Sequence, residues 1–284
     1  MNASSTSYGQ SYMSGFINLL VVVIALVIFY YSFQFFFGEA TQSSYTVEPG
    51  KLTANQGVKI YANQAQIYEG GEYSVNMWLY ISGWKTNQGT RKHVFELGGS
   101  NFSTLLVALG AYKNSLSVRV STKGNSGVDA SGNDASGNKM PHAQGQGQGQ
   151  GGEVLLDAAT LTSFFKPLSM DDGLLNVQPS CDIEEIDLQR WTQVSVVING
   201  RTCDVYMDGK LARSCVLPHF YKVDPTGQSV KLIDRAGFDG YISQVKTFNY
   251  ALTPNVIYQS YMAGPSGSNL DAWAYLKSFF GPPN

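Results

Sequence analysis

The 284-residue chain has few positive charges and few histidines, with 19 Lys and Arg against 21 Asp and Glu, and 3 His. Proteins that bind nucleic-acid phosphates need clustered Lys and Arg, so a net charge of −2 without a basic patch argues against that partner. The sequence also lacks a P-loop and a dinucleotide fingerprint. His93, His142 and His219 show no metal-ligand spacing with one another or with the cysteines. We therefore predict no nucleic-acid partner, no cofactor and no metal.

Charge is absent from residues 16–37, which read FINLLVVVIALVIFYYSFQFFF. As a helix rising about 1.5 Å per residue, this run would be about 33 Å long, enough to cross a hydrocarbon core of about 30 Å. A cleaved signal peptide is the alternative, but residues 1–15 contain no Lys or Arg and the apolar run is too long for one. We predict a polar tail over residues 1–15 and a transmembrane helix over residues 16–37. The predicted membrane-anchor residues are Phe16, Leu20, Ile24, Ile28, Phe35 and Phe37.

Cysteine is scarce, with only Cys181, Cys203 and Cys215. The Asp208-Gly209 dipeptide predicts a two-residue hairpin turn, and this turn would place Cys203 opposite Ser214. Cys215 would then point to the other face, which disfavours a bridge between Cys203 and Cys215. We expect free, partly buried thiols and a reducing compartment, with a bridge from Cys181 to either of the others left open.

Most of the chain after the apolar run has the alternating pattern of β-strands. Residues 73–81, YSVNMWLYI, place Tyr73, Val75 and Met77 on one face and Trp78 and Tyr80 on the other. Two hairpin dipeptides, NG and DG, divide residues 191–217 into a three-stranded meander. Further strands are predicted at residues 93–97, 104–109, 116–120 and 241–248.

Helices and irregular segments occupy the remainder. A short helix is predicted to begin after Thr253, the capping residue, and to end near Gly264. Residues 269–280, NLDAWAYLKSFF, have the spacing of an amphipathic helix within a C-terminal tail over 265–284. Residues 38–55 are predicted to be a polar linker.

A low-complexity insertion is predicted over residues 121–153, in which DASGN is repeated and Gln and Gly alternate. A calcium loop is the alternative, because Asp and Asn oxygens are hard ligands. The segment has neither the glutamate nor the spacing of an EF-hand, so we predict a solvated loop.

The order of these signals resembles a known family. Residues 191–217 carry the order W…V…V.NG…VY.DG.L, residues 237–242 read GFDGYI, and residues 249–254 read NYALTP. Together they resemble concanavalin A-like jelly rolls of the laminin-G-like type, and residues 73–79 look like the first core strand of that family. The resemblance covers residues 56–264 and implies an all-β, antiparallel jelly-roll β-sandwich.

Residues 205–218, VYMDGKLARSCVLP, are similar to a particular form of this domain. It occurs, often behind one N-terminal membrane helix, in structural proteins of large icosahedral double-stranded DNA viruses. That resemblance implies a minor capsid protein that links an internal virion membrane to the capsid shell. Its partners would be the lipid bilayer and other capsid proteins.

A hydrolase can be tested against the sequence, because glucanases of this fold carry a strand motif E-x-D-x-x-E whose outer carboxylates perform the reaction. The nearest match begins at Glu185 and ends at Arg190, where the acid/base should stand. An arginine stays protonated and cannot transfer the proton. We predict that the chain is not an enzyme.

A single-pass, cell-surface glycan-binding module is the alternative to the capsid protein. Trp84 and Tyr112 lie on predicted loops, where aromatic rings can stack on a sugar, but no calcium-site signature accompanies them. The predicted partner contacts are Trp84, Tyr112, Trp273, Phe279 and Phe280. The sequence alone thus favours a non-enzymatic, membrane-anchored structural protein of the virion.

Overall fold

The computed structural model describes residues 16–29, 32, 43–62, 66–124, 153–169, 181–235 and 237–266. The chain divides into two compact units, Met1–Gln42 and Ser43–Asn284. In the first unit residues 16–29 are helical, whereas Phe35 and Phe37 of the predicted anchor lie outside the described residues. No helix among the described residues combines the length and the apolar character needed to cross a membrane.

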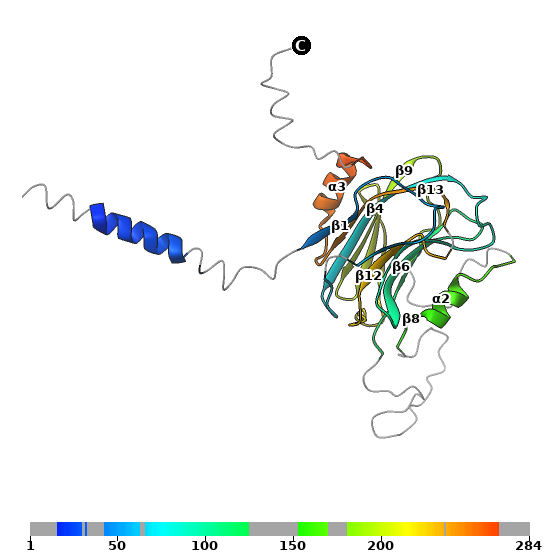
Figure 1. The fold of residues 1–284 in the computed structure, drawn as a ribbon, viewed down its shortest axis with the longest axis horizontal. Helices are drawn as coiled ribbons and strands as arrows, with labels where there is room; N and C mark the ends of the chain where they lie inside the picture. The colour runs from blue at the N-terminus through cyan, green and yellow to red at the C-terminus, as the bar shows by residue number, and fades with distance from the viewer. Residues whose placement is uncertain are drawn as a thin grey trace, which may run out of the picture. The chain divides into compact units, whose positions relative to one another are not determined.

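The second unit is a sandwich of two antiparallel sheets (Figure 1). Sheet A has seven strands, which in spatial order are β1 (Ser44–Glu48), β13 (Asp239–Phe248), β4 (Glu72–Gly83), β9 (Trp191–Asn199), β10 (Thr202–Met207) and β11 (Lys210–Val216), with β2 (Leu52–Thr53) beside β13. Sheet B has six, in the order β3 (Lys59–Tyr61), β12 (Ser229–Leu232), β5 (Lys92–Gly98), β6 (Phe102–Leu109) and β7 (Leu116–Val120), with β8 (Leu156–Asp157) beside β6. The predicted antiparallel β-sandwich is confirmed in a mostly β unit.

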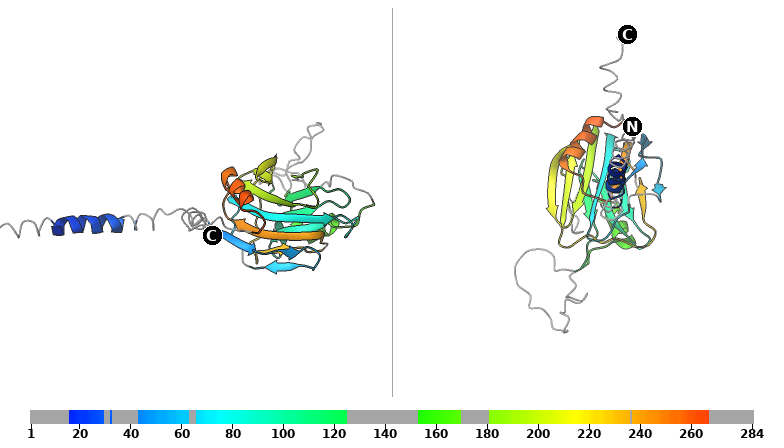
Figure 2. Two further views of the ribbon diagram at one scale, coloured as in Figure 1. Left: turned by 90° about the horizontal axis from the view of Figure 1, so that it is seen from above. Right: turned by 90° about the vertical axis from the view of Figure 1, so that its left-hand side faces the viewer.

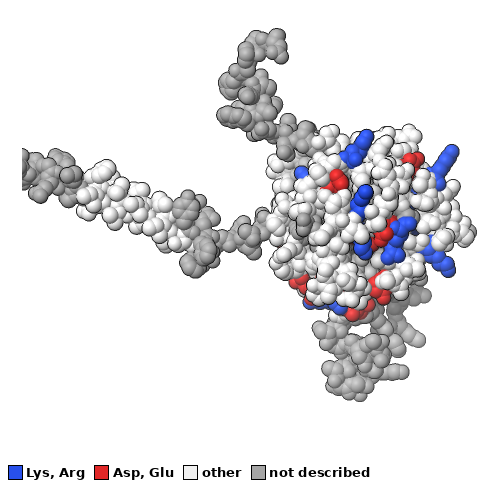
Figure 3. Space-filling view, in the orientation of Figure 1, with Lys and Arg blue, Asp and Glu red and all other residues white. Residues whose placement is uncertain are grey.

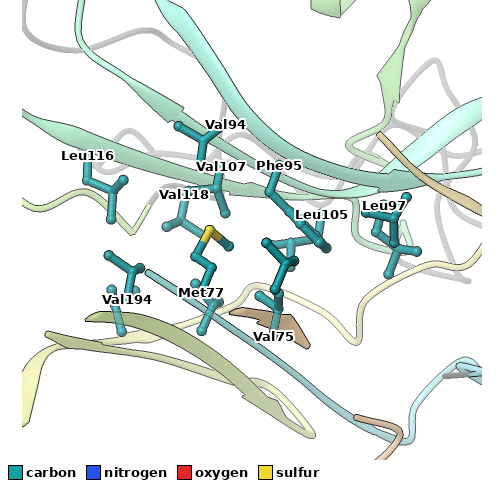
Figure 4. Close-up of a cluster of buried hydrophobic side chains, with 14 of the residues drawn as sticks. Val75, Met77, Val94, Phe95, Leu97, Leu105, Val107, Leu116, Val118 and Val194 are labelled. Atoms are coloured by element: carbon teal, nitrogen blue, oxygen red, sulfur yellow. The ribbon is translucent and has the colours of Figure 1, made fainter. Parts of the chain in front are cut away.

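The core lies between the inner faces of the two sheets. Because successive side chains of a strand point to opposite faces, β4 directs Val75 and Met77 inward and leaves Trp78 and Tyr80 on the outer face. Figure 4 shows Val75 and Met77 of sheet A facing Val107 and Val118 of sheet B, all four fully buried. This interdigitated apolar layer is the main stabilising contact of the domain.

A helix packs on the outer face of each sheet. α2 (Ala158–Phe164) contributes Leu161 and Phe164 to a small apolar cluster with Leu106 and Ala108 of β6. α3 (Pro254–Ala263) lies over part of the outer face of sheet A (Figure 2). The α3 prediction is confirmed, with the Thr253 side chain accepting a hydrogen bond from the first helical turn and Pro at the start.

Strands β1 and β2 lie within residues 38–55, which the sequence predicts to be a linker. β1 pairs with β13 and buries Val47. The alternation within β1 covers only five residues, four of them polar or partly polar, so the pattern is too short to identify without its partner strand. Residues 38–42 of the predicted linker lie outside the described residues.

The first two residues of the predicted insertion belong to the sandwich. Thr122 pairs with Val154 and with Tyr221, and both Ser121 and Thr122 are buried. Residues 125–152 of the insertion lie outside the described residues.

The predicted register of the meander is wrong beyond its turn. Met207 pairs with Lys210 as the Asp208-Gly209 turn requires, but a β-bulge at Ala212 shifts the register, so Cys203 lies opposite Cys215 rather than Ser214. The expectation of free thiols is wrong for two of the three cysteines, and the alternative that was left open, a bridge from Cys181, is the one observed. Cys181 and Cys215 form a disulfide, and Cys203 is the buried free thiol.

We expect Cys215→Ser to lower the free energy of unfolding by about 2–4 kcal/mol, because the disulfide closes a long loop. Cys203→Ala, which leaves the bridge intact, is the control and should cost less. Urea unfolding measures both variants. Alkylation of the unfolded, unreduced chain should label one thiol, and labelling of all three would contradict the disulfide.

A buried polar cluster lies on the outer face of sheet B. Glu96 is fully buried and accepts hydrogen bonds from Ser103 Oγ at 2.6 Å and from Lys231 Nζ at 3.0 Å. His93 Nδ1 accepts from the Asp234 backbone N–H, so Nε2 carries the proton directed at Glu96, 3.2 Å away. Burial alone would raise the pKa of Glu96, but the hydrogen bonds from His93, Ser103 and Lys231 outweigh it and lower the pKa from 4.5 to about 2.

Because the pKa of Glu96 is lower in the folded protein than in the unfolded chain, ionised Glu96 stabilises the fold at pH values above 4.5. This stabilisation is lost as the pH falls from 4.5 towards about 2. Glu96→Gln should therefore reduce the free energy of unfolding at neutral pH by up to about 3 kcal/mol. It should also weaken the decline of stability between these pH values. Urea titrations at pH 7 and pH 3 measure both effects, with the exposed Glu184→Gln as control. Equal pH dependence in Glu96→Gln and the wild type would refute this assignment.

Candidate functional site

Three aromatic side chains form a row across the outer face of sheet A. Tyr80 on β4 pairs directly with Trp191 on β9 on one side and with Tyr241 on β13 on the other. Residues directly opposite one another in adjacent strands share a face. Because the neighbouring Leu79 and Ile81 point into the core, Tyr80 and its two partners must point outward. We call these three residues the aromatic row.

The rings of the aromatic row contact one another without being buried. Their centroids lie 5.6 Å apart for Tyr80 and Trp191, 6.0 Å for Tyr80 and Tyr241, and 6.4 Å for Trp191 and Tyr241. All three residues are partly exposed. Lys51 Nζ lies 4.4 Å from the centroid of the Tyr241 ring, a cation–π contact at the edge of the row.

A surface hollow of about 310 Å³ opens beside Trp191. Its other walls come from three parts of the chain that are far apart in sequence or on different elements: the turn after β1, strand β13 and the chain after α3. The lining residues are Pro49, Gly50, Lys51, Trp191, Ser243, Pro265 and Ser266. The hollow thus combines one aromatic wall with hydroxyl groups, a lysine and backbone amides.

Specific hydrogen bonds hold these walls together. Ser243 Oγ donates to the Pro265 carbonyl at 2.9 Å, and the Gln244 side-chain amide donates to the Pro49 carbonyl. A β-bulge in β13 lies at this point, and Gln244 has a φ of 51°, a left-handed conformation that costs a non-glycine residue about 1–3 kcal/mol. Such strain persists where surrounding contacts impose it, and it often marks a functional site.

α3 covers the adjacent part of the same face. The ring of Trp78 stacks on Tyr261 at 5.9 Å, and Asn76 Nδ2 donates to Ser260 Oγ at 2.7 Å. The aromatic row lies beyond this contact, two residues along β4 from Trp78. It is therefore the part of this face that α3 leaves open.

The predicted contact residues do not lie in this site. Trp84 is partly buried against the core, with Lys92 Nζ 4.8 Å from its ring centroid. Tyr112 is also partly buried, and its hydroxyl donates to the Leu168 carbonyl at 2.6 Å. Both side chains pack within the loops of their own domain, so a partner role for them stays a prediction. Trp273, Phe279 and Phe280 lie outside the described residues.

The sequence predicts that Tyr80 lies on the outer face of its strand. It does not predict that Trp191 and Tyr241 lie beside it. The signal that would have revealed them is strand pairing, which brings together residues more than 100 positions apart. Trp191 begins its strand and Tyr241 follows a glycine, so neither stands out in a local pattern. The row exists only once β4, β9 and β13 are aligned.

The glucanase-like segment over residues 185–190 is exposed over most of its length in the described structure. Arg190 of this segment forms ion pairs with Asp187 at 2.7 Å and with Asp208 at the tip of the β10–β11 hairpin. No group of three or more His, Cys, Asp or Glu with metal-binding geometry occurs in the parts of the chain that the structure covers. Acidic and basic side chains are interspersed on the face seen in Figure 3, where no region of a single sign dominates.

Neither a known sequence family nor a curated protein sequence matches the chain. Solved structures similar to it include the binding domain of botulinum neurotoxin serotype D, with 11% identity and a TM-score of 0.46 over 80% of this chain. Another is the serotype D ligand-binding domain in complex with N-acetylneuraminic acid, with 14% identity and a TM-score of 0.42 over 80% of this chain. The chain spans only 48% and 47% of those two chains. Sequence identities and TM-scores this low give no information about the ligand of this chain.

Proposed function

We propose that this chain is a non-enzymatic, membrane-anchored binding protein whose sandwich binds a carbohydrate at the aromatic row. The observation that carries this proposal is the open row of three rings beside a polar hollow. Sugar rings present a face of C–H groups that packs on aromatic side chains, while their hydroxyls need hydrogen-bonding partners at the edge. Trp191 supplies the apolar face, and the Ser266 hydroxyl and the Lys51 ammonium supply hydrogen-bonding partners.

The size of the hollow supports a small ligand or the end of a longer one. Its volume of about 310 Å³ lies at the lower end of the range of about 300–1,000 Å³ for ligand pockets. The row extends the contact surface from Trp191 to Tyr241. A chain of sugars lying along the row would therefore contact more of the protein than a single ring in the hollow.

The membrane anchor is the second part of the proposal. The helix over residues 16–29 exposes apolar side chains on all sides, including Phe16, Leu20, Ile24 and Ile28. Exposed apolar surface of this kind is unfavourable in water and favourable in lipid. We propose that residues 16–37 cross the membrane as one helix. The disulfide between Cys181 and Cys215 favours a sandwich that faces an oxidising compartment, as on a cell surface.

A minor capsid protein of a large DNA virus is the second candidate. It is favoured by the resemblance of residues 205–218 to such proteins and by the short connection to the sandwich. Only residues 38–43 separate the proposed membrane helix from β1. A connection this short would hold a concanavalin A-like jelly roll close to a bilayer, as a link between a virion membrane and a capsid shell requires.

We expect Trp191→Ala to weaken carbohydrate binding by more than about tenfold, because it removes the ring shared by the row and the hollow. The measurement is a glycan array probed with the detergent-solubilised full chain, followed by calorimetry with the strongest free sugar. Tyr68→Ala, which removes an exposed aromatic ring outside the row, is the matched control. An array without sugar-competed binding, or equal affinity in Trp191→Ala, would contradict the carbohydrate site.

A charge in the proposed anchor should release the protein from membranes. Each Lys at the centre of a membrane helix costs about 2.5–3.5 kcal/mol, so Leu20→Lys with Ile24→Lys should move the chain from the pellet to the supernatant after alkaline carbonate extraction. Ile24→Leu is the control and should stay in the pellet. Release of the wild-type chain by carbonate would refute the anchor. Stoichiometric presence in purified virus particles, without sugar binding, would favour the capsid candidate.

A further inference from the structure

Three large, mainly apolar side chains, two on α3 and one on the neighbouring strand β11, are exposed to solvent. Leu211 is 53% exposed, Tyr258 48% and Met262 59%. Tyr258 and Met262 are one turn apart on α3 and so lie on one side of the helix. Leu211 pairs directly with Tyr206, which packs with Ile257 of α3, so Leu211 lies on the face of the sheet that α3 covers. We call these three residues the α3 strip.

The α3 strip is continuous with the hairpin between β10 and β11. A Cβ atom at Gly209 would lie 3.1 Å from Tyr258 Cδ2, so the tip of the hairpin touches α3. β11 is the edge strand of sheet A, and it has no strand beyond it among the described residues. The α3 strip therefore lies at the edge of sheet A, and no described strand covers it on the side away from β10.

The chain itself supplies a segment of suitable composition and position. The described residues end at Ser266, just after the last residue of α3, Ala263. Residues 269–280 follow, and Leu270, Trp273 and Phe280 recur in them at helical spacing. A connection of about 2–5 residues suffices to join two antiparallel helices, and residues 264–268 provide it.

We propose that residues 269–280 of the same chain pack antiparallel along α3 and cover the α3 strip. A helix of this length would extend about 18 Å, against about 15 Å for α3, so the two match along their length. A second copy of the chain is a poorer occupant, because a stable interface buries about 800 Å² on each partner and the strip offers three side chains. A segment already attached through a short connection has an effective concentration in the millimolar range.

Packing of this segment would also stabilise a wall of the hollow. Pro265 and Ser266, which line the hollow, lie between α3 and residues 269–280. The Pro265 carbonyl is already held by Ser243 on one side. A docked segment would hold the same residues from the other side. The inference itself does not depend on what the hollow binds.

The test is amide hydrogen exchange of the full chain in detergent, comparing wild type with a Trp273→Ala/Phe280→Ala variant. We expect exchange in α3 to become about tenfold faster in the variant, because the covering segment is lost. Exchange in β4 should not change, which shows that the sandwich is still folded. Asp271→Asn is the matched control, since it alters a polar position of the same segment and should leave α3 protected.

A second measurement reports direct contact. With methionines labelled at the methyl carbon, the resonance of Met262 should move in Trp273→Leu, because the ring no longer lies beside it; Met262→Leu assigns the resonance. Unchanged α3 exchange together with an unmoved Met262 resonance would overturn the proposal. It would equally be overturned by α3 protection that rises with protein concentration, which would indicate a second copy. Protection that requires added lipid vesicles would assign the strip to a membrane surface and also refute the proposal.

Discussion

The pairing of β4 with both of its neighbours determines the core and the candidate site together. β4 is bonded along nearly its whole length to β13 on one side and to β9 on the other. Because side chains alternate, the register that directs Met77 into the core also directs Tyr80 outward, beside Trp191 and Tyr241. A slip of one residue would bury Tyr80 and expose Leu79. The hydrophobic layer between the sheets excludes that slip, so it also keeps the aromatic row in place.

Much of the sandwich was predictable because its signals are local. The alternation over residues 73–81, the two hairpin dipeptides and the cap at Thr253 each depend on neighbouring residues, and the structure contains the corresponding strands, hairpins and helix. The first hairpin turns one residue later than predicted, at Gly200-Arg201, because Asn199 pairs with Thr202. What failed depends on how a strand fits against its partner strand. The bulge at Ala212 arises from how β11 fits against β10, and β1 is a strand because β13 offers it an edge.

The candidate site shows the same division. The outward direction of Tyr80 follows from its own strand, but its meeting with Trp191 and Tyr241 requires three strands to be aligned. Trp84 and Tyr112 are predicted contacts because loops carry many binding residues. In the structure both side chains support loops of their own domain, Tyr112 by a hydrogen bond to Leu168 and Trp84 by contact with the core. A partner role for these two side chains stays a prediction.

The outer face of sheet A is used in two different ways along the same strand. Trp78 and Asn76 are covered by α3, and this contact is made of ring stacking and a side-chain hydrogen bond. Tyr80 lies one outward position further along and remains partly exposed. At the boundary between the covered and the open part, β13 carries the strained Gln244, whose side chain holds the turn after β1. Hydrogen bonds therefore hold the edge of the open part in one conformation, including the left-handed backbone of Gln244. A surface that is already ordered before binding has a lower entropic cost when it binds a ligand.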